Sequence, residues 1–125
     1  ITHYFILFAD LKNKVLNNQI IKNLKKHSSK EKYLLSSVKS NHQKFEEKRY
    51  WRGPVWINCN WIIYQGLKNK NIKFAKQIKR KTINLVKQKG FNEYFSCKTG
   101  KGFGATNFSW TAALFLDLML ENKND

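Results

Sequence analysis

The sequence is poor in acidic residues, proline and cysteine. Its 125 residues include 8 Asp and Glu against 24 Lys and Arg, together with one proline and two cysteines. Two isolated cysteines exclude a disulfide framework and a CxxC-type zinc site, and the three histidines are scattered along the chain. We therefore predict no metal centre and no cofactor. The sparse cysteine usage also favours a reducing, cytoplasmic compartment.

Long apolar runs are missing as well. The run from Trp110 to Leu120 is eleven residues long even when Asp117 is ignored, and a membrane-spanning helix needs about 20. We therefore expect no membrane partner. The glycines at positions 100, 102 and 104 are not preceded by a strand pattern, so they do not indicate a dinucleotide-binding site.

Positive charge is what the sequence has in excess, with a formal net charge of +16. Such a charge is typical of proteins that bind nucleic acid or other anionic partners. Here the basic residues are nearly all lysine and are spread along the chain, and the densest run, KQIKRK at 76–81, lies in an amphipathic segment. Solvated helix faces account for this pattern, so we expect no nucleic-acid partner. A non-enzymatic basic helical module that binds nucleic acid stays open as an alternative.

Aromatic residues are concentrated at positions 50–61, which read YWRGPVWINCNW. Indole and phenol rings stack on the apolar face of a sugar, and amide and guanidinium groups form hydrogen bonds with its hydroxyls. We assign Trp51 and Trp56, near the start of a predicted helix, to such a site. Trp61 lies a full turn inside that helix and is predicted to be a core residue. Arg52 could orient a carboxylate or hold the loop, and we favour the loop-holding role.

A second segment has the same character. It reads GFNEYF at 90–95, TGKGFG at 99–104 and NFSWTAAL at 107–114. Glu93 is a lone carboxylate between aromatic residues, followed by a glycine-rich loop and by a helix that carries Trp110 near its start. A carboxylate in this setting is a candidate for acid–base chemistry. Taken alone, however, Glu93 is better interpreted as an ordinary exposed glutamate.

Hydrophobic periodicity predicts about five helices and no strand hairpin. The predicted helices cover residues 1–11, 17–27, 55–67, 71–89 and 108–120, and a long polar loop covers 28–49. Pro54 is expected at the first position of the third helix, Gly90 just after the fourth, and Asn107 as the cap of the last. The fourth helix should bury one face. That face consists of Phe74, Ala75, Ile78, Thr82, Leu85 and Val86.

The aromatic segments together resemble a known family. The stretches YWRGPVWINCNWIIYQGL at 50–67, GFNEYF at 90–95 and TGKGFGATNFSWTAALFLDL at 99–118 are similar to the C-terminal end of glycoside hydrolase family 63, especially its bacterial mannosylglycerate and glucosylglycerate hydrolases. The resemblance implies an all-α fold, with residues 1–125 as the C-terminal part of an (α/α)6 toroid. It also implies an inverting α-glycosidase in which Glu93 is the general base. Its sugar-contacting residues would be Tyr50, Trp51, Trp56 and Trp110, with a carbohydrate as substrate.

One catalytic group of that family is missing here. The general-acid aspartate belongs to an upstream motif that this sequence lacks. A toroid of twelve helices also needs far more than this chain, at roughly 20–30 residues for each helix and loop. We therefore expect the rest of the enzyme to lie upstream in a longer chain, and we expect this piece alone to be inactive.

Two further points follow from the resemblance. A trehalase-like hydrolase shares the fold and the use of two carboxyl groups, and it stays as an alternative that the YWRGPVW segment disfavours. The sequence also departs from the many relatives that have an Asp-Pro pair shortly after the EYF tripeptide. Ser96 and Cys97 stand there instead, so we expect the following loop to turn differently.

Overall fold

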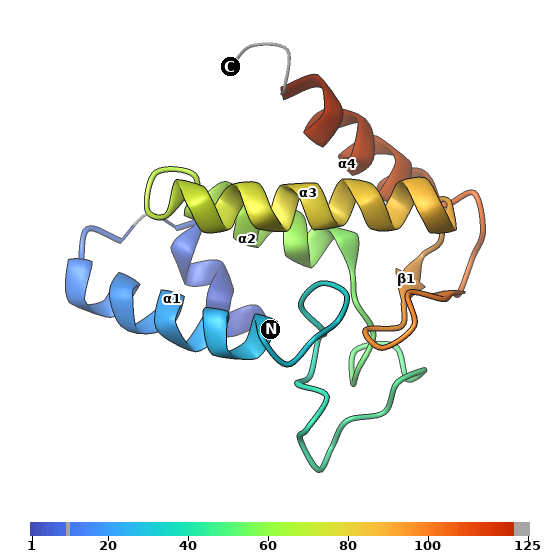
Figure 1. The fold of residues 1–125 in the computed structure, drawn as a ribbon, viewed down its shortest axis with the longest axis horizontal. Helices are drawn as coiled ribbons and strands as arrows, with labels where there is room; N and C mark the ends of the chain where they lie inside the picture. The colour runs from blue at the N-terminus through green and yellow to red at the C-terminus, as the bar shows by residue number, and fades with distance from the viewer. Residues whose placement is uncertain (10, 122–125) are drawn as a thin grey trace.

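The chain is mostly helical, which confirms the predicted all-α class. The computed structural model describes residues 1–9 and 11–121 (Figure 1). The elements follow one another as the 3₁₀ helix η1 (Thr2–Leu7), α1 (Lys14–Ser28), α2 (Ile57–Leu67), α3 (Ile72–Lys89), β1 (Tyr94–Phe95), β2 (Gly102–Phe103) and α4 (Ser109–Leu120). Within the described residues, no helix has the length and apolar character needed to cross a membrane. Closure of a full helical ring stays a prediction.

Helix α2 is the centre of the core, and it contacts η1, α3 and α4. Its side chains Ile63 and Leu67 are fully buried. Gly66 allows η1 to cross it closely, because an added Cβ there would lie 2.6 Å from the backbone of Leu7 and of Phe8. The apolar pattern of the sequence therefore predicted correctly that this helix is largely buried.

Helix α3 is amphipathic as expected. All six residues of its predicted apolar face are buried. The lysines and arginine assigned to the opposite side, at positions 73, 76, 80 and 87, are exposed. Asn71 caps the helix, since its Oδ1 accepts a hydrogen bond from Phe74 N at 3.2 Å. Gly90 ends it with a φ of 80°, in the left-handed region that favours glycine.

Two predicted boundaries near the N-terminus were wrong. The first segment is a 3₁₀ helix ending at Leu7 and not an α-helix to residue 11; Asp10, in that predicted helix, lies outside the described residues. Helix α1 begins three residues earlier than predicted, at Lys14, because Asn13 accepts a hydrogen bond from Leu16 N at 3.0 Å. The apolar pattern starts later than this polar cap and so could not locate it.

Helix α2 begins at Ile57, which corrects the predicted start at Val55. Val55 is extended, and it exchanges two backbone hydrogen bonds with Phe95, at 2.8 and 2.9 Å. Pro54 is therefore outside the helix. Helix α4 likewise begins at Ser109, and Asn107 does not cap it, because its backbone adopts a φ of 53° and the N-cap residue is Phe108.

The prediction that no strand hairpin exists was also wrong. β1 and β2 pair antiparallel, with Tyr94 opposite Phe103 and Phe95 opposite Gly102. Two-residue strands are too short to produce an alternating pattern that sequence reasoning could detect. The sheet lies at the end of the molecule where the loop after α1 and the entry to α2 converge (Figure 1).

The long loop before α2 is polar in sequence, yet its middle is buried. Leu34, Leu35 and Ser36 are at most 3% exposed. The buried amide of Asn60 holds this stretch against α2, since it accepts a hydrogen bond from Leu35 N and donates one to Leu35 O, both at 3.1 Å. The middle of the loop is therefore an ordered, buried segment that packs next to the hairpin.

Candidate functional site

Five aromatic rings gather where the 50–56 segment meets the β1–β2 hairpin. Trp56 is stacked between Trp51, at 4.3 Å between ring centroids, and Tyr94, at 5.0 Å. Tyr50 lies edge-on to Trp56 at 4.7 Å. Phe103 continues the row, with its centroid 6.0 Å from that of Tyr94. We call these five residues the aromatic cluster.

The cluster has a buried inner ring and exposed outer rings. Trp56 is only 2% exposed, whereas Tyr50 and Trp51 are 47% and 46% exposed. The indole Nε1 of Trp56 donates a hydrogen bond to the backbone O of Tyr50 at 2.9 Å, so the buried ring also fixes the backbone of the exposed one. A fixed aromatic face that is open to solvent is the surface a sugar ring needs for stacking.

Glu93 lies at the edge of the aromatic cluster. Its Oε2 accepts a hydrogen bond from Ala105 N at 3.0 Å, and its own N–H donates to Ala105 O at 2.9 Å. Interaction with the Glu93 carboxylate, chiefly by hydrogen bonding, raises the pKa of the Tyr50 phenol above its ordinary value. The predicted base and the predicted aromatic residue therefore share one site.

Trp110 is placed differently from the other predicted site residues. It is 50% exposed in the first turn of α4, and no ring contact joins it to the aromatic cluster in the described part of the chain. The next residue, Thr111, donates a hydrogen bond from Oγ1 to Asn92 O at 2.8 Å. Helix α4 thus begins next to the residue that precedes Glu93, and Trp110 flanks the site.

Sequence reasoning missed two members of the cluster. Tyr94 and Phe103 were seen only as neighbours of Glu93 and of the glycines, because their pairing depends on the hairpin register. The sequence signal that could have indicated this pairing is the aromatic residue directly after Glu93. The assignment of Trp61 to the core is only partly right, because its ring is half-buried and its Nε1 donates to Asp117 Oδ2 at 2.6 Å.

Arg52 contributes to the loop that carries Tyr50 and Trp51. Its guanidinium Nη1 lies 3.1 Å from Glu46 Oε1, and its backbone O accepts a hydrogen bond from Glu46 N at 2.7 Å. Gly53 lets the chain pass close to Glu46, because a Cβ added at Gly53 would lie 2.3 Å from the backbone O of Glu46. These contacts fit the loop-holding role expected for Arg52.

The Ser96 hydroxyl organises the turn between the two strands. Its Oγ accepts hydrogen bonds from Lys98 N at 3.1 Å and from Thr99 N at 3.0 Å. It also donates a hydrogen bond to the Glu47 carboxylate. An aspartate in this place would accept the same two N–H groups with its own carboxylate. In this chain the carboxylate next to the turn comes from Glu47, and the different course expected for this loop stays a prediction.

The two cysteines are buried thiols outside the site. Burial raises the pKa of Cys59 to about 11 and that of Cys97 to about 12. A thiol with a raised pKa is a poor nucleophile and metal ligand near neutral pH. Within residues 1–9 and 11–121, no group of three His, Cys, Asp or Glu side chains could hold a metal ion.

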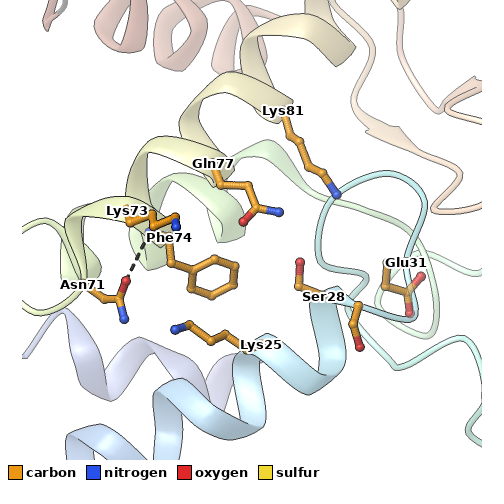
Figure 2. Close-up of a pocket in the computed structure, with 9 residues that line it drawn as sticks. Lys25, Ser28, Glu31, Asn71, Lys73, Phe74, Gln77 and Lys81 are labelled. Carbon is orange, nitrogen blue, oxygen red and sulfur yellow. Dashed lines mark hydrogen bonds between the residues drawn. The ribbon is translucent and has the colours of Figure 1, made fainter.

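A separate cavity of about 460 Å³ lies between α1 and α3. Figure 2 shows Phe74 at its centre with Lys25 and Lys73 nearby, Lys81 from the next turns of α3, and Glu31 at the far side. Glu31 Oε1 already accepts hydrogen bonds from Ser36 Oγ and Ser40 N. The cavity shares no residue with the aromatic cluster, and its lining is mostly polar side chains around the buried ring of Phe74.

Comparison with known proteins identifies the family of this chain. Residues 1–111 match the family model described as the mannosylglycerate hydrolase MGH1-like glycoside hydrolase domain. The chain belongs to this family. The resemblance to glycoside hydrolase family 63 noted from the motifs is thereby confirmed.

Individual relatives are glycoside hydrolases that are much longer than this chain. This chain is 38% identical over 111 residues to the mannosylglycerate hydrolase of Thermus thermophilus. The aligned region covers 88% of this chain and 27% of the relative. This chain is 45% identical over 78 residues to the mannosylglycerate hydrolase of Rubrobacter radiotolerans, covering 62% of this chain and 18% of that protein. The chain thus spans about a quarter or less of the length of these relatives.

A solved structure supports the fold. The crystal structure of the family 63 mannosylglycerate hydrolase from Thermus thermophilus in complex with glucose superposes with a TM-score of 0.81 at 37% identity. The match covers 89% of this chain and 29% of that one. The helices described here therefore have the arrangement of the corresponding part of that larger enzyme.

Proposed function

We propose that this chain supplies the general base and the sugar-stacking surface of an inverting α-glycoside hydrolase that acts on mannosylglycerate or glucosylglycerate. The observation that carries the proposal is the Glu93 carboxylate, held by Ala105 N beside the aromatic cluster. Relatives named mannosylglycerate hydrolase and glucosylglycerate hydrolase support this choice of substrate class.

Glu93 takes a proton from the attacking water in this mechanism. Inversion requires a second carboxyl group roughly 6.5–9.5 Å away, so that a water molecule fits between the base and the sugar. We assign the general acid to a region of the longer enzyme that this chain does not match. The remainder of that enzyme is therefore its main protein partner.

The aromatic cluster binds the sugar ring. Trp51 and Tyr50 offer the exposed faces, Trp56 supports them from inside, and Trp110 closes the site from the start of α4. Two carboxyl groups and a bound water suffice for this chemistry, so the mechanism uses no metal and no cofactor.

The full-length protein tests the proposal through Glu93→Gln. The amide keeps the size of the side chain but cannot accept the proton, so kcat should fall by at least about 10²-fold while KM changes little. Asp117→Asn is the matched control, because this exposed carboxylate on α4 accepts a hydrogen bond from Trp61, which lies outside the aromatic cluster. NMR detection of the first anomer released should show inverted configuration. Near-normal kcat in folded Glu93→Gln would remove Glu93 as the base.

A further inference from the structure

Gly104 lies against the Glu93 carboxylate. Its backbone has a φ of 72°, in the left-handed region. A Cβ at this position would lie 2.4 Å from Glu93 Oε2 and 2.8 Å from Cε1 of Tyr94. Any side chain at position 104 would therefore collide with the proposed base and with one ring of the aromatic cluster.

The residue after Gly104 holds Glu93 at two points. The amide of Ala105 donates to Glu93 Oε2 at 3.0 Å, and its carbonyl accepts from Glu93 N at 2.9 Å. One residue thus fixes both the backbone and the carboxylate of Glu93. Ala105 is exposed, so without the carboxylate its amide would face water.

We propose that Gly104 is a positioning residue for the general base. Because it has no side chain, the turn at residues 104–105 approaches closely enough for Ala105 N–H to fix one carboxylate oxygen, and this leaves the other oxygen to take the proton from water. This role rests on the proposed function of Glu93. It is distinct from sugar binding, since Gly104 has no side chain with which to contact a substrate.

The geometry predicts a kinetic effect confined to the chemical step. A displacement of about 1 Å in a catalytic group lowers the rate by about 10²-fold. In the full-length protein, Gly104→Ala should lower kcat by about 10–100-fold and leave KM within about twofold, because the atoms nearest to the added Cβ belong to Glu93 and Tyr94 and not to the exposed rings of Tyr50 and Trp51.

Gly90→Ala is the matched control. Gly90 has a similar φ of 80°, but the nearest atom to an added Cβ is Asn92 Nδ2 at 3.9 Å, an ordinary van der Waals distance. Both variants place alanine in a left-handed backbone, and only Gly104→Ala displaces Glu93. Gly90→Ala should therefore retain kcat. Equal kcat values in the two variants would overturn the proposal.

A second variant covers the case in which Gly104→Ala does not fold. Ala105→Pro removes the backbone N–H that donates a hydrogen bond to Glu93 Oε2, and it adds no side chain at position 104. It should lower kcat to a similar extent, whereas wild-type kcat in Ala105→Pro would show that the hydrogen bond does not position the base.

Amide hydrogen exchange at Ala105, followed by NMR, gives a readout that does not depend on activity. The amide should be protected in the wild type, and exchange should accelerate in Glu93→Ala and in Gly104→Ala but not in Gly90→Ala. Unchanged protection in Gly104→Ala would overturn the positioning role. If the protein hydrolyses neither glycoside, the proposed function fails, and exchange at Ala105 still decides whether Gly104 positions the carboxylate.

Discussion

At the scale of single residues, Trp56 links the hydrophobic core to the aromatic cluster. It is buried, it stacks on Trp51 and Tyr94, and it donates a hydrogen bond to the backbone of Tyr50. The exposed rings therefore have defined positions before any ligand arrives. A surface that needs no rearrangement loses less conformational entropy on binding a sugar.

Trp51→Ala tests the stacking surface. Removing one aromatic partner costs about 0.5–1.5 kcal/mol beyond the lost buried area. We therefore expect kcat/KM of the full-length enzyme to fall roughly 3- to 10-fold, with KM raised. Steady-state kinetics on mannosylglycerate measure this effect. Phe8→Ala is the control, since Phe8 is a similarly exposed aromatic residue that contacts Trp61 and not the cluster; an equal loss there would argue against a specific role for Trp51.

The residues of the site differ in how far the sequence could predict them. Glu93, Trp51 and Trp56 belong to short motifs whose residue types suit the chemistry. Tyr94 and Phe103 join the cluster only through the pairing of two-residue strands, and pairing across a loop leaves no periodic signal. The position of Gly104 beside Glu93 also depends on this register.

At the scale of elements, the sequence predicted which segments are helical better than where they begin. All six residues predicted for the apolar face of α3 are buried, because eighteen residues give several helical repeats; the buried Ile83 was not predicted. The start of α2 was misplaced because Pro54 is as compatible with extended backbone as with a first helical turn. Val55 is extended because Phe95, forty residues later, supplies its hydrogen-bond partner.

The end of α1 carries a buried histidine that should make stability depend on pH. His27 packs beneath the loop, where its Nε2 lies 3.2 Å from Ser36 Oγ and its Nδ1 has no partner among the described groups. Burial lowers the pKa of His27 to about 4, although the Glu31 carboxylate opposes this shift; Lys39, His3 and the N-terminal amine add to the lowering.

The direction of the effect follows from proton uptake. As pH falls from about 6.5 to about 4, the unfolded chain binds a proton at His27 and the folded chain does not, so the free energy of unfolding decreases. The loss should reach roughly 3 kcal/mol. Urea unfolding at several pH values measures it. His27→Gln keeps a hydrogen-bonding group without this titration and should flatten the profile; parallel profiles for the two proteins would contradict the prediction.

At the scale of the whole molecule, α4 has an apolar outer face. Leu116 and Leu120 are 56% and 59% exposed, and Ala113 on the same face is also exposed. Polar contacts hold the inner side of this helix, where Glu121 accepts hydrogen bonds from Tyr64 and Lys68. Burial acts to raise the pKa of Glu121, but these bonds hold it below its usual value. A contiguous apolar stripe of this kind usually marks a contact surface.

We expect the 125-residue chain to self-associate through this face of α4. Replacing Leu116 and Leu120 together by lysine should shift the chain towards a monomer in sedimentation or light scattering. Val15→Lys is the control, because Val15 is 81% exposed on α1 and is not part of the stripe. A monodisperse wild-type monomer with a sharp thermal transition would count against the prediction.

The hydrogen bond from Thr111 to Asn92 O has a consequence for motion. It ties the segment that carries Glu93 to α4, a helix in which only two of the twelve residues, Thr111 and Leu118, are buried. Helices with so little buried surface open locally more often than the rest of a fold, on timescales of microseconds or longer. We therefore expect the ordering of Glu93 to depend on the contact of α4 with α2 and α3, and a partner that covers the outer face of α4 should prolong it.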